Sequence, residues 1–220
     1  WLARAEIAGA GFINFHLEPP AHTAVLLQVA QQGERFGESR TGAGEKILLE
    51  FVSANPTGPL HVGHGRQAAY GATLASLLAA AGYQVQREYY VNDAGRQMNI
   101  LTASTWVRYL ERCGDAPAFP SNGYRGNYVH AIAEQLYRQC GRELYRPAAQ
   151  VTADLPADEP AGDKEQHVDA LIERMRSLLG AAAFERVQQL SLTTMLDDIR
   201  GDLTAFGVGF DRWYSERELT

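Results

Sequence analysis

The fold is decided by the stretch from Glu50 to Ala68, which reads EFVSANPTGPLHVGHGRQA. It follows a short apolar run, ILLEFV, turns through a segment with two prolines, and reaches two histidines in the pattern His-x-Gly-His. An apolar run of this kind is typical of a strand that is buried on both faces of a parallel sheet. A helix is expected from about His64. Its apolar residues recur at helical spacing, at Leu74, Leu77, Leu78 and Ala81.

A second strand is expected after this helix. Gly82 stands where a left-handed residue would end the helix, and the alternating segment YQVQREYYV follows it. The order strand, loop, helix, strand is a βαβ unit, here placed over residues 45–94. It predicts an α/β fold with a Rossmann-like parallel sheet of the nucleotide-binding kind.

The remaining segments differ from this unit. Residues 1–18 alternate like a strand from Phe12 to Leu17, after a turn at Gly9 and Gly11, and residues 19–44 are expected to form a helix near 20–32 and a linker. Residues 95–162 predict a mainly helical insertion that ends in an acidic, proline-rich loop. Residues 163–220 predict a helical return segment. Its first helix would be capped by Asp163, and its last helix would run from about Phe184 to Phe206.

Composition limits the class of protein. The net charge of the 220 residues is −6, which argues against a protein that coats phosphate backbones without specificity. Cys113 and Cys140 make neither a disulfide framework nor a plausible zinc site, so a reducing, cytoplasmic setting and no metal site are expected. No apolar run is long enough to span a bilayer, and the start at Trp1 has no signal-peptide pattern. We expect the chain to be part of something longer.

The histidine pair suits a polyphosphate. Helix N-termini present unpaired N–H groups and a positive dipole end, and anions bind there readily. Imidazoles at the same place can donate to phosphate oxygens, and Gly63 between them would let a flat base approach the backbone. The short pattern alone fits equally well two histidines that cap a helix or face water.

The longer segments carry a resemblance. EFVSANPTGPLHVGHGR and YYVNDAGRQ resemble the first and second catalytic segments of bacterial arginyl-tRNA synthetases, which are class I aminoacyl-tRNA synthetases. YRGNYVHAIAEQL and LDDIRGDLTAFGVGFDRWYSE are similar to later segments of that family, and AEIAGAGFINFHL looks like the tail of its N-terminal additional domain, here residues 1–18. The resemblance implies ATP-dependent activation of L-arginine and its ligation to tRNA(Arg), with Mg²⁺ accompanying ATP as substrate.

The resemblance also implies roles for named residues. His61 and His64 would be catalytic and would contact ATP, together with Gly63 and Pro56. The arginine-binding residues would be Glu50, Ser53, Asn55, Asn92 and Asp93. For several of these a structural role is the alternative: an ion pair for Glu50, loop geometry for Ser53 and Asn55, and a helix cap for Asn92 and Asp93. Tyr124 and Tyr128 are expected to pack the insertion.

Other functions stay open on the residues alone. The chain lacks a Lys-Met-Ser-Lys-Ser-type loop, so we expect it to hold half of an active site and to be inactive alone. The alternatives are a smaller nucleotidyltransferase with the same histidine pattern and a non-catalytic module, derived from a synthetase, that binds tRNA or a partner protein. The sequence does not fix the oligomeric state, although a monomer is expected for the full-length enzyme.

Overall fold

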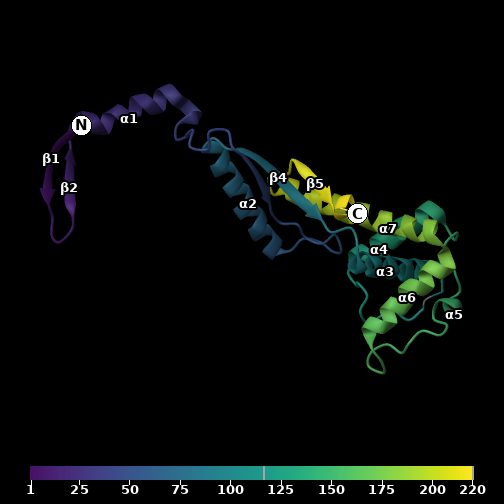
Figure 1. Ribbon diagram of the computed structural model, residues 1–220. Coiled ribbons are helices and arrows are strands. Elements are labelled where there is room, and N and C mark those ends of the chain that lie inside the picture. The colour runs from purple at the N-terminus through teal and green to yellow at the C-terminus, as the bar shows by residue number, and fades with distance from the viewer. Residues whose placement is uncertain (116, 220) are drawn as a thin grey trace. The chain divides into compact units, whose positions relative to one another are not determined.

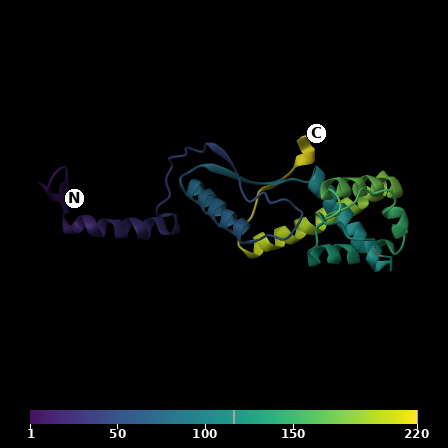
Figure 2. The same cartoon turned by 90° about the horizontal axis from the view of Figure 1, so that it is seen from below.

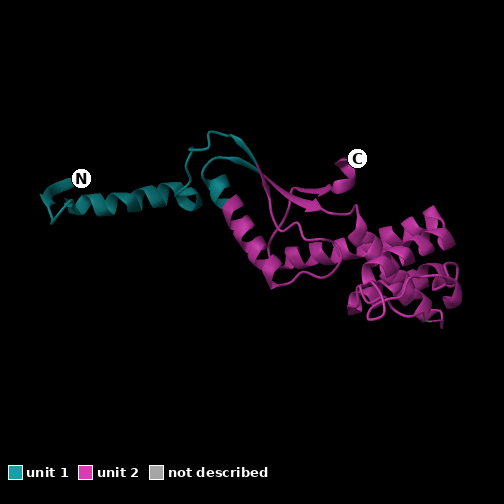
Figure 3. Ribbon diagram, turned by 60° about the horizontal axis from the view of Figure 1, so that its bottom comes forward, with its two compact units in different colours: residues 1–47, 76–85 teal, residues 48–75, 86–220 magenta. Residues whose placement is uncertain are grey.

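The structure, a computed structural model, describes residues 1–115 and 117–219. The chain divides into two compact units, residues 1–47 with 76–85 and residues 48–75 with 86–220 (Figure 3). Three elements run from one unit into the other: strand β3 (Lys46–Glu50), helix α2 (Val62–Ala80) and strand β4 (Gln84–Val91).

The first unit begins with an antiparallel hairpin of β1 (Leu2–Ile7) and β2 (Ile13–Leu17). The strand expected over Phe12–Leu17 is confirmed as β2, but its partner β1 was missed. The apolar residues that alternate with Arg4 and Glu6 in β1 are two alanines and Ile7, and all of β1 is exposed, so the strand has no buried apolar face. A polar contact joins the two strands, since a Glu6 carboxylate oxygen lies 2.7 Å from the His16 ring nitrogen.

The rest of this unit follows the prediction closely. Helix α1 (Pro19–Gln32) is the expected helix, and a short 3₁₀ helix, η1 (Gly33–Arg35), follows it. The linker then pairs with the end of α2, since the Ser39 amide donates to the Ala80 carbonyl at 2.8 Å. Gly82 ends α2 with φ of 91°, a left-handed conformation that glycine adopts at little cost.

The sheet has three strands in the order β3, β4, β5. Strand β5 (Arg212–Ser215) lies beside β4 and is parallel to it (Figure 1). Strand β5 was not predicted: residues 163–220 are not wholly helical, and four residues are too short to show a period. The expectation that β3 is buried on both faces is also wrong. Because β3 is an edge strand, only one of its faces is half-buried, and Leu48 on the other face is 56% exposed.

Small residues form the fully buried part of α2, while three residues of the predicted stripe, Leu74, Leu78 and Ala81, are half-buried. Ala68, Gly71 and Ala75 are buried, whereas Leu77 is 63% exposed. The Phe51 ring occupies the space beside Gly71, where a Cβ atom would overlap it. Glycine at this position therefore lets the chain that leaves β3 lie directly against α2.

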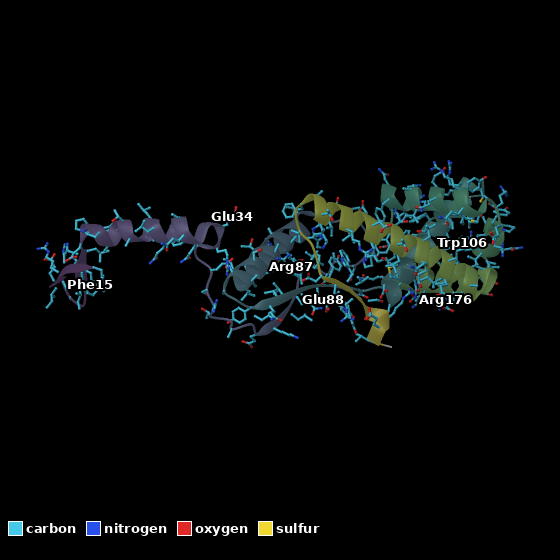
Figure 4. All side chains as sticks on the ribbon, turned by 90° about the horizontal axis from the view of Figure 1, so that it is seen from above. Phe15, Glu34, Arg87, Glu88, Trp106 and Arg176 are labelled. Atoms are coloured by element: carbon cyan, nitrogen blue, oxygen red, sulfur yellow. The ribbon has the colours of Figure 1, made fainter. Side chains whose placement is uncertain are left out.

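The helical part is built on α3 (Arg96–Arg112), which packs against α4 (Asn127–Cys140), α6 (Lys164–Leu179) and α7 (Ala181–Ala205) (Figure 2). A short helix, α5 (Ala148–Val151), packs on α6. Trp106 of α3 is fully buried among these helices and donates through Nε1 to the Leu144 carbonyl at 3.0 Å (Figure 4). Within the residues that the structure describes, no helix is long and apolar enough to cross a membrane.

The helices and the sheet share a buried core, which fixes the insertion against the sheet. That core joins Tyr89 of β4 to Met98 of α3, Ile132 of α4 and Ile199 of α7. The cap expected at Asp163 is confirmed, because its carboxylate accepts from the Glu165 amide at 2.8 Å. After Ser215 the chain ends in a 3₁₀ helix, η2 (Glu216–Leu219).

The contact between Gly71 and Phe51 gives a stability prediction. We expect Gly71→Ala to lower the free energy of unfolding by about 1–3 kcal/mol, because the added methyl group overpacks the Phe51 contact. Gly201→Ala, within α7, is the matched control, because a Cβ atom there meets no heavy atom within 4 Å. It should raise stability by up to about 1 kcal/mol through helix propensity. Chemical denaturation measures both, and an unchanged midpoint for Gly71→Ala would contradict the packing.

Candidate active site at the carboxyl ends of the strands

The turn that follows β3 is strained. Val52 and Ser53 have φ of 67° and 41°, a left-handed conformation that costs a non-glycine residue about 1–3 kcal/mol. Two contacts with β4 hold it. The Tyr90 amide donates to Ser53 Oγ at 3.0 Å, and the Tyr89 hydroxyl donates to the Ala54 carbonyl at 3.0 Å. Ser53 thus replaces a backbone carbonyl of the ladder, so the chain can leave the sheet while β4 continues.

The two histidines form a stacked pair at the start of α2. Their ring centroids are 3.8 Å apart with 21° between the planes. The His61 carbonyl accepts from the His64 and Gly65 amides, and His61 Nδ1 accepts from the Gly63 amide at 3.1 Å. His61 therefore caps the helix with its ring, which leaves Nε2 as the atom that can donate to a ligand.

Gly63 makes this arrangement possible. A Cβ atom there would lie 2.9 Å from His61 Cε1, so any other residue would displace the ring. Burial, and secondly the neighbouring His61, lower the pKa of the His64 imidazole below its ordinary value near 6.5. Without a ligand, His64 is therefore neutral at pH 7.

His64 and Asn55 line the same hollow. This hollow has a volume of about 320 Å³, and Thr57, Gly58, Pro59, Tyr124 and Tyr128 complete its lining. His61 lines a separate hollow of about 250 Å³ with Gly65 and the end of α7, at Leu203 and Phe206. A larger hollow of about 600 Å³ includes Asp93, Arg176 and Arg217 but neither histidine.

Two tyrosines of the helical insertion, Tyr124 and Tyr128, line the candidate site, which the sequence analysis did not predict. Tyr124 and Tyr128 pack against the core, as expected, but they also line the hollow beside His64. The Tyr128 hydroxyl donates to the Thr57 carbonyl at 2.7 Å and so fixes the loop between β3 and α2. The segment YRGNY, in which two tyrosines flank a glycine, could have marked these residues as candidates. Only the fold shows that they lie against the loop between β3 and α2.

The predicted amino-acid residues differ in their surroundings. Glu50 is exposed at the end of β3 and forms no ion pair with any described residue, so the ion pair considered for it is not seen. Asn55 is exposed, and its amide lies 3.1 Å from that of Asn92, whereas Pro56 of the same loop is buried.

Asp93 is only 5% exposed. Its carboxylate accepts from the Ser215 hydroxyl at 2.6 Å and from the Arg217 amide at 3.4 Å. The helix cap considered for Asp93 is not seen, because α3 begins after Gly95 with no side-chain cap. The sequence analysis did not predict β5 and therefore missed Ser215, Glu216 and Arg217. A predicted parallel strand there would have placed these residues at the same edge of the sheet as Asp93, because the carboxyl ends of parallel strands meet at one edge.

Metal ligands are not clustered here. Among residues 1–115 and 117–219, no group of three or more His, Cys, Asp or Glu side chains could hold a metal ion. Cys113 and Cys140 are free thiols.

Comparisons with known proteins agree with the resemblance. The family described as tRNA synthetases class I (R), catalytic domain, matches residues 24–117. The arginine–tRNA ligase of Thioalkalivibrio sulfidiphilus is 57% identical over 220 residues, which cover 100% of this chain and 38% of that protein. The arginine–tRNA ligase of Legionella pneumophila, strain Paris, is 54% identical over 217 residues, 98% of this chain and 37% of the ligase.

Solved structures support the fold. A structure from Campylobacter jejuni, assigned to the arginyl-tRNA synthetases, superposes with a TM-score of 0.66 and 27% identity, covering 92% of this chain and 37% of that one. The Thermus thermophilus arginyl-tRNA synthetase has the same fold at a TM-score of 0.51 and 22% identity, covering 98% of this chain and 29% of that one.

The chain corresponds to only part of each of these relatives. The chain spans about 38% of the length of the curated relatives it matches. Identity over its whole length, the family match and the shared fold agree: the chain is similar throughout to part of the arginyl-tRNA synthetases, and its residues 24–117 match their class I catalytic domain.

Proposed function

We propose that the protein containing this chain is an arginine–tRNA ligase, which activates L-arginine with ATP and transfers it to tRNA(Arg) in the cytoplasm. The observation that carries the proposal is that His64 and Asn55 line one hollow. A nucleotide on the helix end and an amino acid on the strand end would then meet there. The identities of 57% and 54% to proteins named arginine–tRNA ligase support the choice of amino acid.

The first step of the proposed reaction, the activation of arginine, depends on how the site stabilises negative charge on the phosphate of ATP. The arginine carboxylate attacks the α-phosphorus of ATP, and pyrophosphate leaves with its bonding electron pair. Negative charge is rearranged on the phosphate oxygens, so positioning and hydrogen-bond donors, rather than a covalent nucleophile, lower the barrier. We assign this role to His64, which lines the hollow with Asn55, and to His61, which lines the neighbouring hollow and whose ring stacks on that of His64 at 3.8 Å. Mg²⁺ enters with ATP, bound to its phosphates as part of the substrate.

The other predicted residues receive roles that match their surroundings. We assign Gly63 and Pro56 to the nucleotide side of the site, and Glu50 and Asn55 to contact with arginine. Asn92, whose amide lies 3.1 Å from that of Asn55, serves the arginine site through Asn55. Glu50 is exposed and unpaired among the described residues, so its carboxylate is free to meet a guanidinium. Ser53 and Asp93 serve the arginine site indirectly, because their oxygens already accept from β4, β5 and η2.

The first prediction concerns the activation step in the full-length protein. We expect arginine-dependent exchange of pyrophosphate into ATP, and we expect it only when tRNA(Arg) is present, as the family resemblance implies. The measurement is isotope exchange with each of the twenty amino acids, with and without tRNA. Exchange that depends on another amino acid would refute the proposal.

The second prediction concerns His64. His64→Ala in the full-length protein should slow arginine activation about 100-fold or more, with little change in the KM values, because it removes a donor that acts mainly in the transition state. His130→Ala is the matched control, because His130 lies exposed on α4 away from the hollow. Equal rates for His64→Ala and the unmodified protein would remove His64 from the mechanism.

The third prediction concerns protonation. In the free protein, His64 should titrate below the ordinary histidine value, because burial and His61 oppose its charge. Bound ATP should raise that pKa, since the phosphates favour the imidazolium form. The measurement is an NMR titration of His64 with and without ATP. A pKa that ATP leaves unchanged or lowers would contradict a phosphate contact at His64.

A further inference from the structure

A chain of polar side chains connects the end of β5 to the candidate site. Asn92, directly after β4, lies between Asn55 and Glu216 of η2. One polar atom of its amide is 3.1 Å from the Asn55 amide, and the other is 2.6 Å from a Glu216 carboxylate oxygen and 3.0 Å from the Ala94 carbonyl. The way this amide is turned decides what Asn55 can offer to a ligand.

Two orientations of an asparagine amide have the same shape, so hydrogen bonding must select between them. If the oxygen of Asn92 faced Glu216 and Ala94, three acceptors would meet with no proton among them. If the nitrogen faces them, it donates to both the carboxylate and the carbonyl. The Glu216 carboxylate and the Ala94 carbonyl therefore both favour this orientation, and the charged carboxylate, at the shorter distance of 2.6 Å, is the stronger acceptor of the two.

This orientation is passed on to Asn55. The Asn92 oxygen then faces Asn55. The structure has Asn55 Oδ1 at this 3.1 Å contact, where two oxygens cannot bond, so the Asn55 amide turns as well and donates from its NH₂ group. Its oxygen then no longer faces Asn92 and can accept from a ligand in the hollow that Asn55 lines together with His64. We infer that Glu216 is a positioning residue that makes Asn55 present a hydrogen-bond acceptor, and thereby selects the α-ammonium group of the amino acid rather than its carboxylate. This inference rests on the proposed function and names the group that Asn55 recognises.

Glu216 is itself held in place. Asp93 accepts from the Ser215 hydroxyl and the Arg217 amide, the residues on either side of Glu216. Arg217 also donates to Gln188 of α7 at 2.9 Å. The Tyr90 hydroxyl forms a hydrogen bond with Glu216, and burial together with that carboxylate raises the pKa of Tyr90. These contacts fix η2 to the end of β4, so Asp93 helps to hold Glu216 beside Asn92.

An acceptor discriminates between the two ends of an amino acid. A free amide oxygen bonds an ammonium group well, whereas it repels a carboxylate, which has only acceptors. The carboxylate is then left to point toward His64 and the α-phosphate of ATP, where the proposed reaction needs it.

The experiment is a ligand comparison in the full-length protein. Arginine, agmatine and 5-guanidinopentanoate are compared by KM or by inhibition of arginine-dependent exchange. Agmatine lacks the carboxylate, and 5-guanidinopentanoate lacks the ammonium group. In Glu216→Ala, binding of arginine and of agmatine should each weaken roughly tenfold or more, the size expected for a hydrogen bond to a charged group. Binding of 5-guanidinopentanoate should change less than twofold, and so should the KM for ATP.

Glu218→Ala is the matched control. Glu218 lies on the same 3₁₀ helix, but its carboxylate pairs with Arg212 at 2.7 Å and accepts from the Ser215 amide at 3.4 Å, not from Asn92, so all three affinities should stay unchanged. If Glu216→Ala fails to fold, Asn92→Ala removes the same link while leaving η2 in place, and the same pattern is expected.

Two patterns would overturn the inference. Equal weakening of all three ligands would show a general structural role, and weakening of 5-guanidinopentanoate with agmatine spared would show that Asn55 binds the carboxylate. Absence of arginine-dependent exchange in the unmodified protein would instead refute the proposed function, so the two failures can be told apart.

Discussion

The left-handed turn at Val52 and Ser53 is the constraint on which the candidate site depends. The ladder between β3 and β4 ends where the Phe51 amide donates to the Glu88 carbonyl, and the next amide of β4 that turns toward β3, that of Tyr90, donates to Ser53 Oγ instead. A side-chain oxygen thus takes the place of a backbone carbonyl. The chain can leave the sheet abruptly without exposing an unpaired donor in β4. The strain is offset by these contacts, and the result is a loop that crosses the strand ends and delivers His61 to the start of α2.

The helical insertion forms another wall of the hollow beside the turn. Its helices share a buried core with β4, and this core brings Tyr128 against the loop and Tyr124 beside His64. On the other side, β5 places η2 against the end of β4, and the buried Asp93 joins the two. The hollow is therefore bounded by segments far apart in sequence, and its geometry is set by hydrogen bonds to backbone groups as much as by side-chain packing.

Several features could be predicted from the sequence because their signals are local. The βαβ order, the helix stop at Gly82, the cap at Asp163 and the histidines at a helix start all follow from short patterns. Other features depend on tertiary contacts. The four residues of β5 are too few to show a period, and β1 is exposed and charged. The burial of Ala68 and Gly71 in preference to Leu77 reflects the close approach of Phe51, which no helical pattern reveals. Likewise, the internal partners of Asp93 become visible only once β5 is in place.

The central claim is that one site holds the ammonium end of the amino acid at Asn55 and the α-phosphate at His64. A crystal structure of the full-length protein with a non-hydrolysable arginyl-adenylate analogue tests it most directly. The account predicts the ammonium nitrogen within hydrogen-bond distance of Asn55 Oδ1, with the Asn92 NH₂ group on Glu216 and the phosphate analogue within reach of the His64 ring. An analogue bound with its ammonium group away from Asn55, or with its phosphate outside the hollow shared by Asn55 and His64, would contradict it.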